Sequence, residues 1–275
     1  MWLEIKSKLN SVKINKSTLK RILIAILGLI VIGYLLFPPW APLSKARLVG
    51  YSICHQIPER SFHLAGKQLP LCARCTGTYL GILTGFLALF LMRRWYVGEM
   101  LSPPMIILVV SFILIMGVDG LNSYIALLGY KPPLYTPQNW LRAATGSLNG
   151  IALSMIVWPV FNSTLWKTTE PEPPLKNVWE LLGIVLVAQG LVYVVQLEPG
   201  WLLYPLALIS AGMVLGMLSL VNAMIVLILF HQECRAETWR DAILPLLSGL
   251  GLSLLELTAM GVFRYAMTGT LEWPL

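Results

Sequence analysis

The chain has 275 residues, of which 57% are apolar and 12% charged, and its formal net charge is +7. Soluble domains contain roughly 45–50% apolar and about 25% charged residues. The composition therefore excludes an ordinary soluble protein, a disordered chain and a disulfide-rich secreted module. In a membrane protein an excess of basic residues first reports orientation, because Lys and Arg gather in cytoplasmic loops.

Seven stretches of the chain are long and apolar enough to cross a membrane. A helix that spans the hydrocarbon core needs about 20 mostly apolar residues, and only helices or closed barrels satisfy their backbone groups in lipid. The sequence therefore predicts an all-α, polytopic transmembrane bundle of about seven spans. The predicted spans are 20–37, 76–92, 104–121, 140–161, 178–196, 202–231 and 242–263.

The first 21 residues form a basic segment. Trp2, Ile5 and Leu9 recur there at helical spacing between lysines, a pattern that suits a short amphipathic helix on an anionic membrane surface. A frayed basic tail fits the segment equally well. The apolar run that follows could be mistaken for a secretory signal, but a Pro-Pro-Trp sequence at 38–40 and no small-x-small cleavage site come next. We therefore expect a retained first span.

Basic residues also predict the orientation of the spans. With the N-terminus in the cytoplasm, twelve of the 20 Lys and Arg residues lie inside and eight outside, which favours an N-in, C-out protein of the cell membrane. The loop between the first two spans then lies on the extracytoplasmic side. Residues 22–161 form a four-span domain, 162–177 a Pro-rich cytoplasmic linker, and 178–275 a three-span region.

The segment 54–81 carries the residues with the clearest chemistry. Cys72 and Cys75 form a Cys-x-x-Cys motif, which serves a metal ion or a reversible disulfide. Cys54 with His55 or His63 completes three thiolates and an imidazole, the ligand set of a closed zinc site. A metal site, a redox dithiol and inert packed thiols are three open interpretations. Zinc is the cofactor that the first of them implies.

Charged residues gather near the same predicted membrane boundary. Arg60 and Arg74 lie in the Cys/His segment, Arg142 begins the fourth span, Asp119 ends the third, and Glu256 lies in the outer half of the seventh. Ionisable residues inside spans are costly and are functional candidates by default. We expect the three arginines to bind an anion or an anionic substrate. A structural ion pair between Asp119 and Arg142 is the alternative.

Glycines recur every four residues in three of the predicted spans. Small residues at this spacing let two helices approach closely, which is a usual source of helix association in lipid. The pattern predicts a compact bundle. The positions are Gly77, Gly81 and Gly85 in the second span, Gly146 and Gly150 in the fourth, and Gly212 and Gly216 in the sixth.

The Cys/His segment resembles the signature of an uncharacterised prokaryotic membrane-protein family that carries a domain-of-unknown-function label. The resemblance covers residues 54 to about 150, and Asn122-Ser123 depart from it. It implies a small helical membrane domain and no assigned activity, and it favours His55 over His63 as a ligand. The matching residues are Cys54-His55-Gln56, Pro58, Arg60-Ser61-Phe62, Gly66, Pro70, Cys72-Ala73-Arg74-Cys75-Thr76-Gly77, Tyr79 and Gly81, then Asp119-Gly120-Leu121, Asn139, Arg142, Thr145-Gly146 and Gly150.

Three classes of function follow. The Cys/His/Arg cluster could belong to a metal-binding or redox membrane protein, with enzymatic activity an open question. A transporter would instead use Asp119, Glu256 and Arg142. A structural or assembly subunit would have other membrane subunits as partners besides the lipid bilayer. His231 and Cys234, at the inner end of the sixth span, are expected to be packed residues outside the cluster.

The sequence lacks the common catalytic and nucleotide-binding motifs of soluble enzymes. It contains no phosphate-cradling glycine loop, no His-Glu-x-x-His and no Gly-x-Ser-x-Gly elbow. The basic residues divide between the two membrane faces and form no soluble patch, so we expect no nucleic-acid partner.

Overall fold

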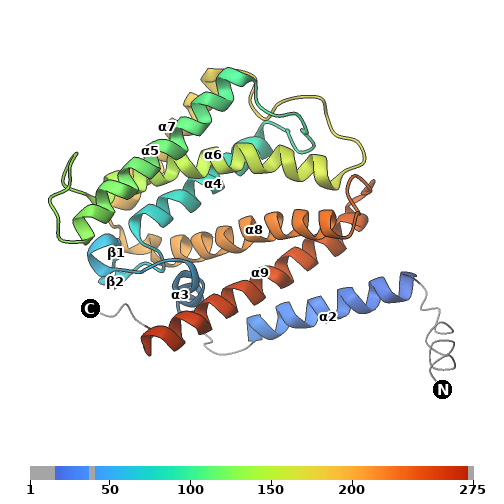
Figure 1. Cartoon of the computed structure of the whole chain (residues 1–275), viewed down its shortest axis with the longest axis horizontal. Helices are drawn as coiled ribbons and strands as arrows, with labels where there is room; N and C mark the ends of the chain where they lie inside the picture. The colour runs from blue at the N-terminus through green and yellow to red at the C-terminus, as the bar shows by residue number, and fades with distance from the viewer. Residues whose placement is uncertain (1–15, 37–40, 272–275) are drawn as a thin grey trace.

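The computed structural model describes residues 16–36 and 41–271, and these residues are almost wholly helical (Figure 1). The strands within them pair in one short antiparallel hairpin, β1 (His63–Leu64) with β2 (Lys67–Gln68). The predicted all-α, polytopic fold is confirmed. The helices are α2 (Lys16–Leu36), α3 (Pro42–Ile53), α4 (Ala73–Leu91), α5 (Pro103–Leu127), α6 (Asn139–Leu165), α7 (Val178–Gln196), α8 (Leu203–Leu229) and α9 (Trp239–Thr268), with 3₁₀ turns η1 (Pro58–Arg60) and η2 (Gly200–Leu202).

Helices α4 to α9 are each long and apolar enough to cross a membrane. They coincide with the last six predicted spans, which are therefore confirmed. The first predicted span falls on α2, whose 21 residues would extend about 31 Å at 1.5 Å per residue, the thickness of the hydrocarbon core. The last residue of that span, the Pro-Pro-Trp sequence and the amphipathic pattern of 1–15 lie outside the described residues. A total of seven spans stays a prediction.

The connections between the spans alternate between two ends of the bundle (Figure 1). One end, which we call the α3 end, holds α3, the hairpin and η2. There the His63 amide donates to Glu198 and the Tyr51 hydroxyl to the Thr270 carbonyl. At the opposite end Arg94 pairs with Glu180. This alternation agrees with the predicted loop order, while the choice of cytoplasmic and extracytoplasmic faces stays a prediction.

Glycines bring α4 and α6 into backbone contact. A Cβ atom on Gly77 would lie 2.1 Å from the Ala143 carbonyl oxygen, and one on Gly150 would lie 1.9 Å from the Thr78 carbonyl oxygen. No real side chain tolerates such distances, so only glycine permits this approach. The predicted close packing is confirmed for the second and fourth spans, and it fixes the level of their first turns relative to one another.

The same prediction is wrong for the sixth span. Gly212 of α8 has no neighbouring atom within 4 Å. The close contact on this helix is made instead by Gly249 of α9, whose Cβ would lie 2.2 Å from the Ser219 carbonyl oxygen. Spacing alone does not tell which face of a helix meets a neighbour, and on α8 the neighbour lies on the face of Ser219.

Both halves of the chain contribute to the core at the α3 end. One buried cluster includes Leu80 of α4, Ala143 of α6, Val214 of α8 and Leu257 of α9. The segment after α6 lies at the opposite end, where Glu170 bridges to Val97. The first and second halves therefore pack against each other, and the domain boundaries proposed from the sequence stay a prediction.

Candidate functional site

A tight turn after α3 carries the first two candidate ligands. Cys54 caps the end of α3 in an extended conformation, and Gln56 then adopts a left-handed backbone with φ of 56°, which is uncommon for a residue with a side chain. The Gln56 amide nitrogen donates to the carbonyl oxygens of Arg47 at 3.1 Å and Pro70 at 2.7 Å. The bond to Pro70 ties the turn to the segment that leads into α4, and the bond to Arg47 ties it back to α3.

The start of α4 carries the other two cysteines. Cys72 is the N-cap residue of α4, and its backbone amide donates to the Cys54 sulfur at 3.2 Å. Cys75 follows three positions later, so its side chain projects from the same face of the first helical turn. The Cys-x-x-Cys motif thus begins a helix, with Cys54 facing it from the end of another.

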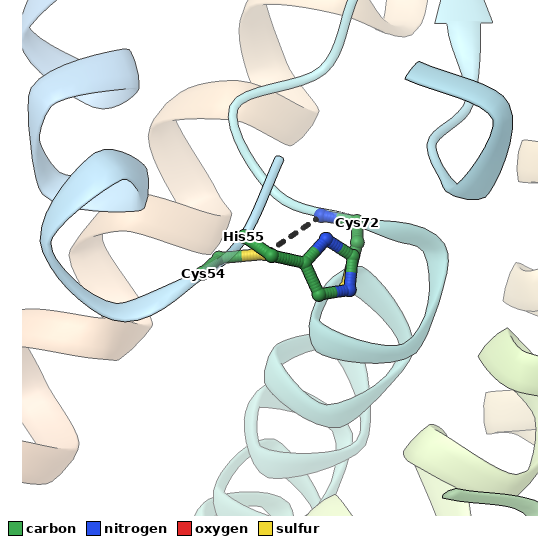
Figure 2. Close-up of side chains that lie close together, drawn as sticks. All are labelled: Cys54, His55 and Cys72. Carbon is green, nitrogen blue, oxygen red and sulfur yellow. Dashed lines mark hydrogen bonds between the residues drawn. The ribbon is translucent and has the colours of Figure 1, made fainter. Parts of the chain in front are cut away.

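The candidate ligand atoms converge (Figure 2). One ligand atom each from Cys54, His55 and Cys72 lies within 4.8 Å of the other two. Cys75 is not in this converging group of three, although it influences the pKa values of Cys54 and Cys72. We call these four residues the Cys/His cluster. His63 lies on the exposed hairpin and its amide faces Glu198, so His55 is the histidine that the fold brings to the cysteines.

Hydrogen bonding within the Cys/His cluster separates the thiol pKa values. Hydrogen bonds from Cys54, then from Cys75, and more weakly from His55 hold the pKa of Cys72 well below its usual range. The hydrogen bond with Cys72 is also the main cause that raises the pKa of Cys54 to about 12, and burial adds to it. The cluster therefore places its first thiolate on Cys72, because the neighbouring thiols donate to that sulfur.

Asp119 anchors a second polar group beside this cluster. It is 1% exposed, and its Oδ2 accepts from Arg74 Nε at 3.1 Å and also from Arg74 Nη2. Its Oδ1 accepts from the Tyr135 hydroxyl at 2.9 Å. The predicted ion pair between Asp119 and Arg142 is wrong. Arg74, in the first turn of α4, reaches α5 first, whereas Arg142 bonds within its own helix.

The three predicted arginines lie at this site, linked through two small polar residues. Arg60 Nη2 donates to the Ser123 carbonyl at 3.2 Å, and Arg74 Nη2 donates to the Ser123 hydroxyl at 3.1 Å. Arg142 Nη1 donates to Asn139 Oδ1 at 2.7 Å. We call Arg60, Arg74 and Arg142 the arginine cluster.

Glu256 does not belong to this group, contrary to its predicted place at the outer boundary. It lies 12 positions before the end of α9, about 18 Å along the helix at 1.5 Å per residue. Its carboxylate accepts from the Asn222 side chain at 2.8 Å. The structure therefore does not bring together the set of Asp119, Glu256 and Arg142 that transport would use.

Arg264 is a site residue that sequence reasoning counted only toward orientation. From α9 its guanidinium donates to the carbonyl oxygens of Tyr51 at 2.7 Å, His55 at 3.1 Å and Cys54. It also lies 4.1 Å from the centre of the Tyr51 ring. It thereby holds the backbone of the first two candidate ligands. An arginine near the end of an apolar span was the signal that could have identified it.

Cys234 lies outside the Cys/His cluster, as the sequence predicts. Its sulfur donates to the Ser163 carbonyl at 3.1 Å near the opposite end of the bundle. His231 and Cys234 are both exposed, so the expectation that they are packed is wrong. Both residues follow α8 in a connecting turn with positive φ values of 50° and 54°, which carries them away from the core.

Comparison with known proteins identifies the family. The family model described as "Predicted membrane protein (DUF2085)" matches residues 54–156. An uncharacterized protein of Methanothermobacter thermautotrophicus is 36% identical over 104 residues, which are 38% of this chain and 83% of that protein. An uncharacterized protein of Methanocaldococcus jannaschii is 31% identical over 129 residues, 46% of this chain and 76% of that protein. The chain belongs to the DUF2085 family. No solved structure matches it.

The matched region contains the Cys/His cluster, the arginine cluster and Asp119. It ends within α6, so α7, α8 and α9 lie outside it. The family description is that of a predicted membrane protein of unknown function, which agrees with the six helices long and apolar enough to cross a membrane.

Proposed function

We propose that the Cys/His cluster binds a zinc ion that joins the end of α3 to the start of α4. The observation that carries this proposal is the convergence of Cys54, His55 and Cys72 within 4.8 Å. In a tetrahedral site with zinc–sulfur bonds of about 2.3 Å, neighbouring sulfurs lie about 3.8 Å apart. The side chains would therefore close by about 1 Å or less on binding.

The composition of the cluster supports zinc over harder ions. Thiolate and imidazole ligands suit zinc, whereas magnesium and calcium require oxygen. The ligand atoms that converge are those of Cys54, His55 and Cys72, and Cys75 would move in to supply the fourth. Four protein ligands fill a tetrahedral shell, which is the arrangement of a structural site and leaves no position for substrate. This favours a stabilising ion in a membrane domain, and it is compatible with a subunit of a larger membrane complex.

Binding through His55 would require one rearrangement. His55 Nδ1 accepts a hydrogen bond from the Ile57 amide at 3.1 Å, so the neutral ring carries its proton on Nε2. A zinc ion on Nε2 would need that proton moved to Nδ1, and the Ile57 amide would lose its acceptor. Alternatively zinc would bind Nδ1 directly and displace the amide.

A redox dithiol is the second candidate function. Cys72 stands at the N-terminus of α4 with Cys75 one turn later, and the His55 side chain hydrogen-bonds to the Cys72 sulfur. A helix N-terminus and a hydrogen-bond donor both stabilise a thiolate, the reactive form in disulfide exchange. In this alternative Cys72 and Cys75 would form a reversible disulfide, and Cys54 would remain a thiol.

Elemental analysis and thiol mapping of one preparation test both candidates. The protein is purified without reductant or chelator, and zinc is measured in the wild type, Cys72→Ser, Cys75→Ser and the exposed control Cys234→Ser. We expect about one zinc ion per chain in the wild type and in the control, and a clear loss in the two cluster variants. A Cys72–Cys75 disulfide without zinc would establish the redox alternative. Zinc-free protein whose thiols all titrate freely would exclude both.

A further inference from the structure

The arginine cluster is the most strongly charged group at the α3 end, and its charges are only partly compensated. Asp119 pairs with Arg74. The salt bridges among the residues that the structure describes are Arg74–Asp119, Arg94–Glu180, Lys167–Glu237 and Lys176–Glu172. Neither Arg60 nor Arg142 takes part in one. Two guanidinium groups near the membrane boundary therefore lack a carboxylate partner in the described chain.

Of these two arginines Arg142 is the more unusual, because it is buried, with 6% of its surface exposed. Its Nη1 donates to Asn139, whereas its buried Nε has no hydrogen-bond partner among the described residues. Buried donors in native proteins almost always have acceptors, and one that lacks an acceptor in the protein calls for an explanation, of which a bound ion or water is one. A buried cation has the strongest need for such an acceptor, because burial removes it from water.

The fold holds the three side chains together from several elements. Ser123 accepts from both Arg60 and Arg74. Asn139 accepts from Arg142 and donates through Nδ2 to the Glu59 carbonyl at 3.1 Å, next to Arg60. Positive charges held close together repel one another, and the fold keeps these three together although, among the described residues, one carboxylate pairs with them. This arrangement is typical of a site in which a bound anion compensates the excess positive charge.

We propose that Arg60, Arg74 and Arg142 bind a phosphate group at the membrane boundary. Guanidinium groups present a planar fork of donors that matches phosphate oxygens, and Ser123 and Asn139 orient them before binding. The proposal does not depend on zinc, because none of the three arginines is a ligand of the Cys/His cluster.

The depth of the arginine cluster fits the phosphate of a lipid headgroup. Arg74 is the second residue of α4 and Arg142 the fourth of α6, so both lie within about one turn, or 5 Å, of the helix ends. Trp140, 43% exposed, stands at the same level of α6, where amphipathic aromatic residues mark membrane interfaces. A lipid phosphate and free inorganic phosphate share the chemistry that these donors recognise, and experiment separates the two sources.

The test compares binding of two probes. Thermal unfolding in a non-ionic detergent is measured with inorganic phosphate or with chloride at equal ionic strength. Binding to phosphatidylcholine vesicles is measured with and without phosphatidic acid. The variants are Arg142→Gln, Arg142→Lys and Arg60→Gln, and the matched control is Lys131→Gln, which removes an exposed charge from the loop before α6.

We expect saturable stabilisation of the wild type and of Lys131→Gln by at least one probe. Arg60→Gln and Arg142→Gln should weaken that binding about tenfold or more, as expected for the loss of a charge-assisted hydrogen bond. Arg142→Lys should recover only part of it, because an ammonium lacks the fork. A response to inorganic phosphate identifies a free oxyanion site, and a response to phosphatidic acid alone identifies a lipid site.

Two results would overturn the proposal. One is a wild type that responds to neither probe while its circular dichroism shows an intact fold. The other is an equal loss of binding in Lys131→Gln and Arg142→Gln, which would indicate general surface charge. Zinc content is measured in the same samples, so a failure of the metal proposal would be seen separately.

Discussion

A substitution at Gly150 would test whether backbone contact between α4 and α6 sets the architecture of the site. In Gly150→Ala the new Cβ would lie 1.9 Å from the Thr78 carbonyl oxygen and 2.7 Å from the Ile82 nitrogen. Ordinary van der Waals contacts begin near 3.4 Å, so the helices would have to separate by about 1.5 Å. Both opposing atoms belong to the backbone of α4, and no side-chain rotation relieves the clash.

The size of the effect follows from overpacking. Forcing an extra methyl group into a well-packed interface costs about 1–3 kcal/mol, although alanine gains up to ~1 kcal/mol over glycine in helix propensity. About 1–2 kcal/mol of destabilisation remains after this gain is subtracted. At about 2–4 °C per kcal/mol for a protein of this size, Gly150→Ala should melt about 2–8 °C below the wild type. The matched control is Gly183→Ala in α7, where no atom lies within 4 Å. It should melt at or slightly above the wild-type temperature.

Far-UV circular dichroism of the three proteins in the same detergent is the assay. Equal melting temperatures for Gly150→Ala and the wild type would refute the argument, because they would show that α4 and α6 are not held in backbone contact. A comparable fall in melting temperature in Gly183→Ala would also refute the argument, because the effect of replacing glycine would then not depend on contact with a neighbouring helix.

The other predictions concern the polar groups of the α3 end. Asp119→Asn removes the carboxylate that pairs with Arg74 and should destabilise the protein by about 3–5 kcal/mol in chemical denaturation. Tyr135→Phe, which removes one donor to that carboxylate, should cost about 1.5–3 kcal/mol. Unchanged denaturation midpoints would contradict both. Arg264→Gln should weaken zinc binding about 10- to 100-fold in a competition titration, because it loosens the backbone of the ligands. Zinc binding at neutral pH should release protons, since the pKa of Cys54 is raised to about 12 without metal; a titration that detects no proton release would contradict this.

The six confirmed spans could be read from the sequence because lipid imposes a simple length and polarity rule. The same rule placed Cys54, Cys72 and Cys75 at one membrane boundary, together with Asp119 and Arg142. The position of a polar residue within or at the end of an apolar run directly gives its depth in the membrane. Depth along the helices was therefore predictable for most of the site.

Contacts between side chains of neighbouring helices could not be predicted from the sequence in the same way. Asp119 had three arginines at its level, and the sequence did not show that Arg74 would reach it first. That choice depends on the rotation of α4 about its axis, which is fixed by the contacts of Gly77 of α4 with α6 and of Gly150 of α6 with α4. The short helix α3 and the hairpin were also missed, because they are too short and too polar to follow a membrane rule.

The second half of the chain contributes directly to the Cys/His cluster. The family match begins at Cys54 and contains all four cluster residues, yet the carbonyl oxygens of Cys54 and His55 accept from Arg264 of α9. Carbonyl groups at the end of a helix must find donors, and near a membrane few waters supply them. The matched relatives align with less than half of this chain but with most of their own length. If they lack a counterpart of α9, another donor must hold these carbonyls. In this chain the geometry of the cluster depends on Arg264, a residue outside the region that defines the family.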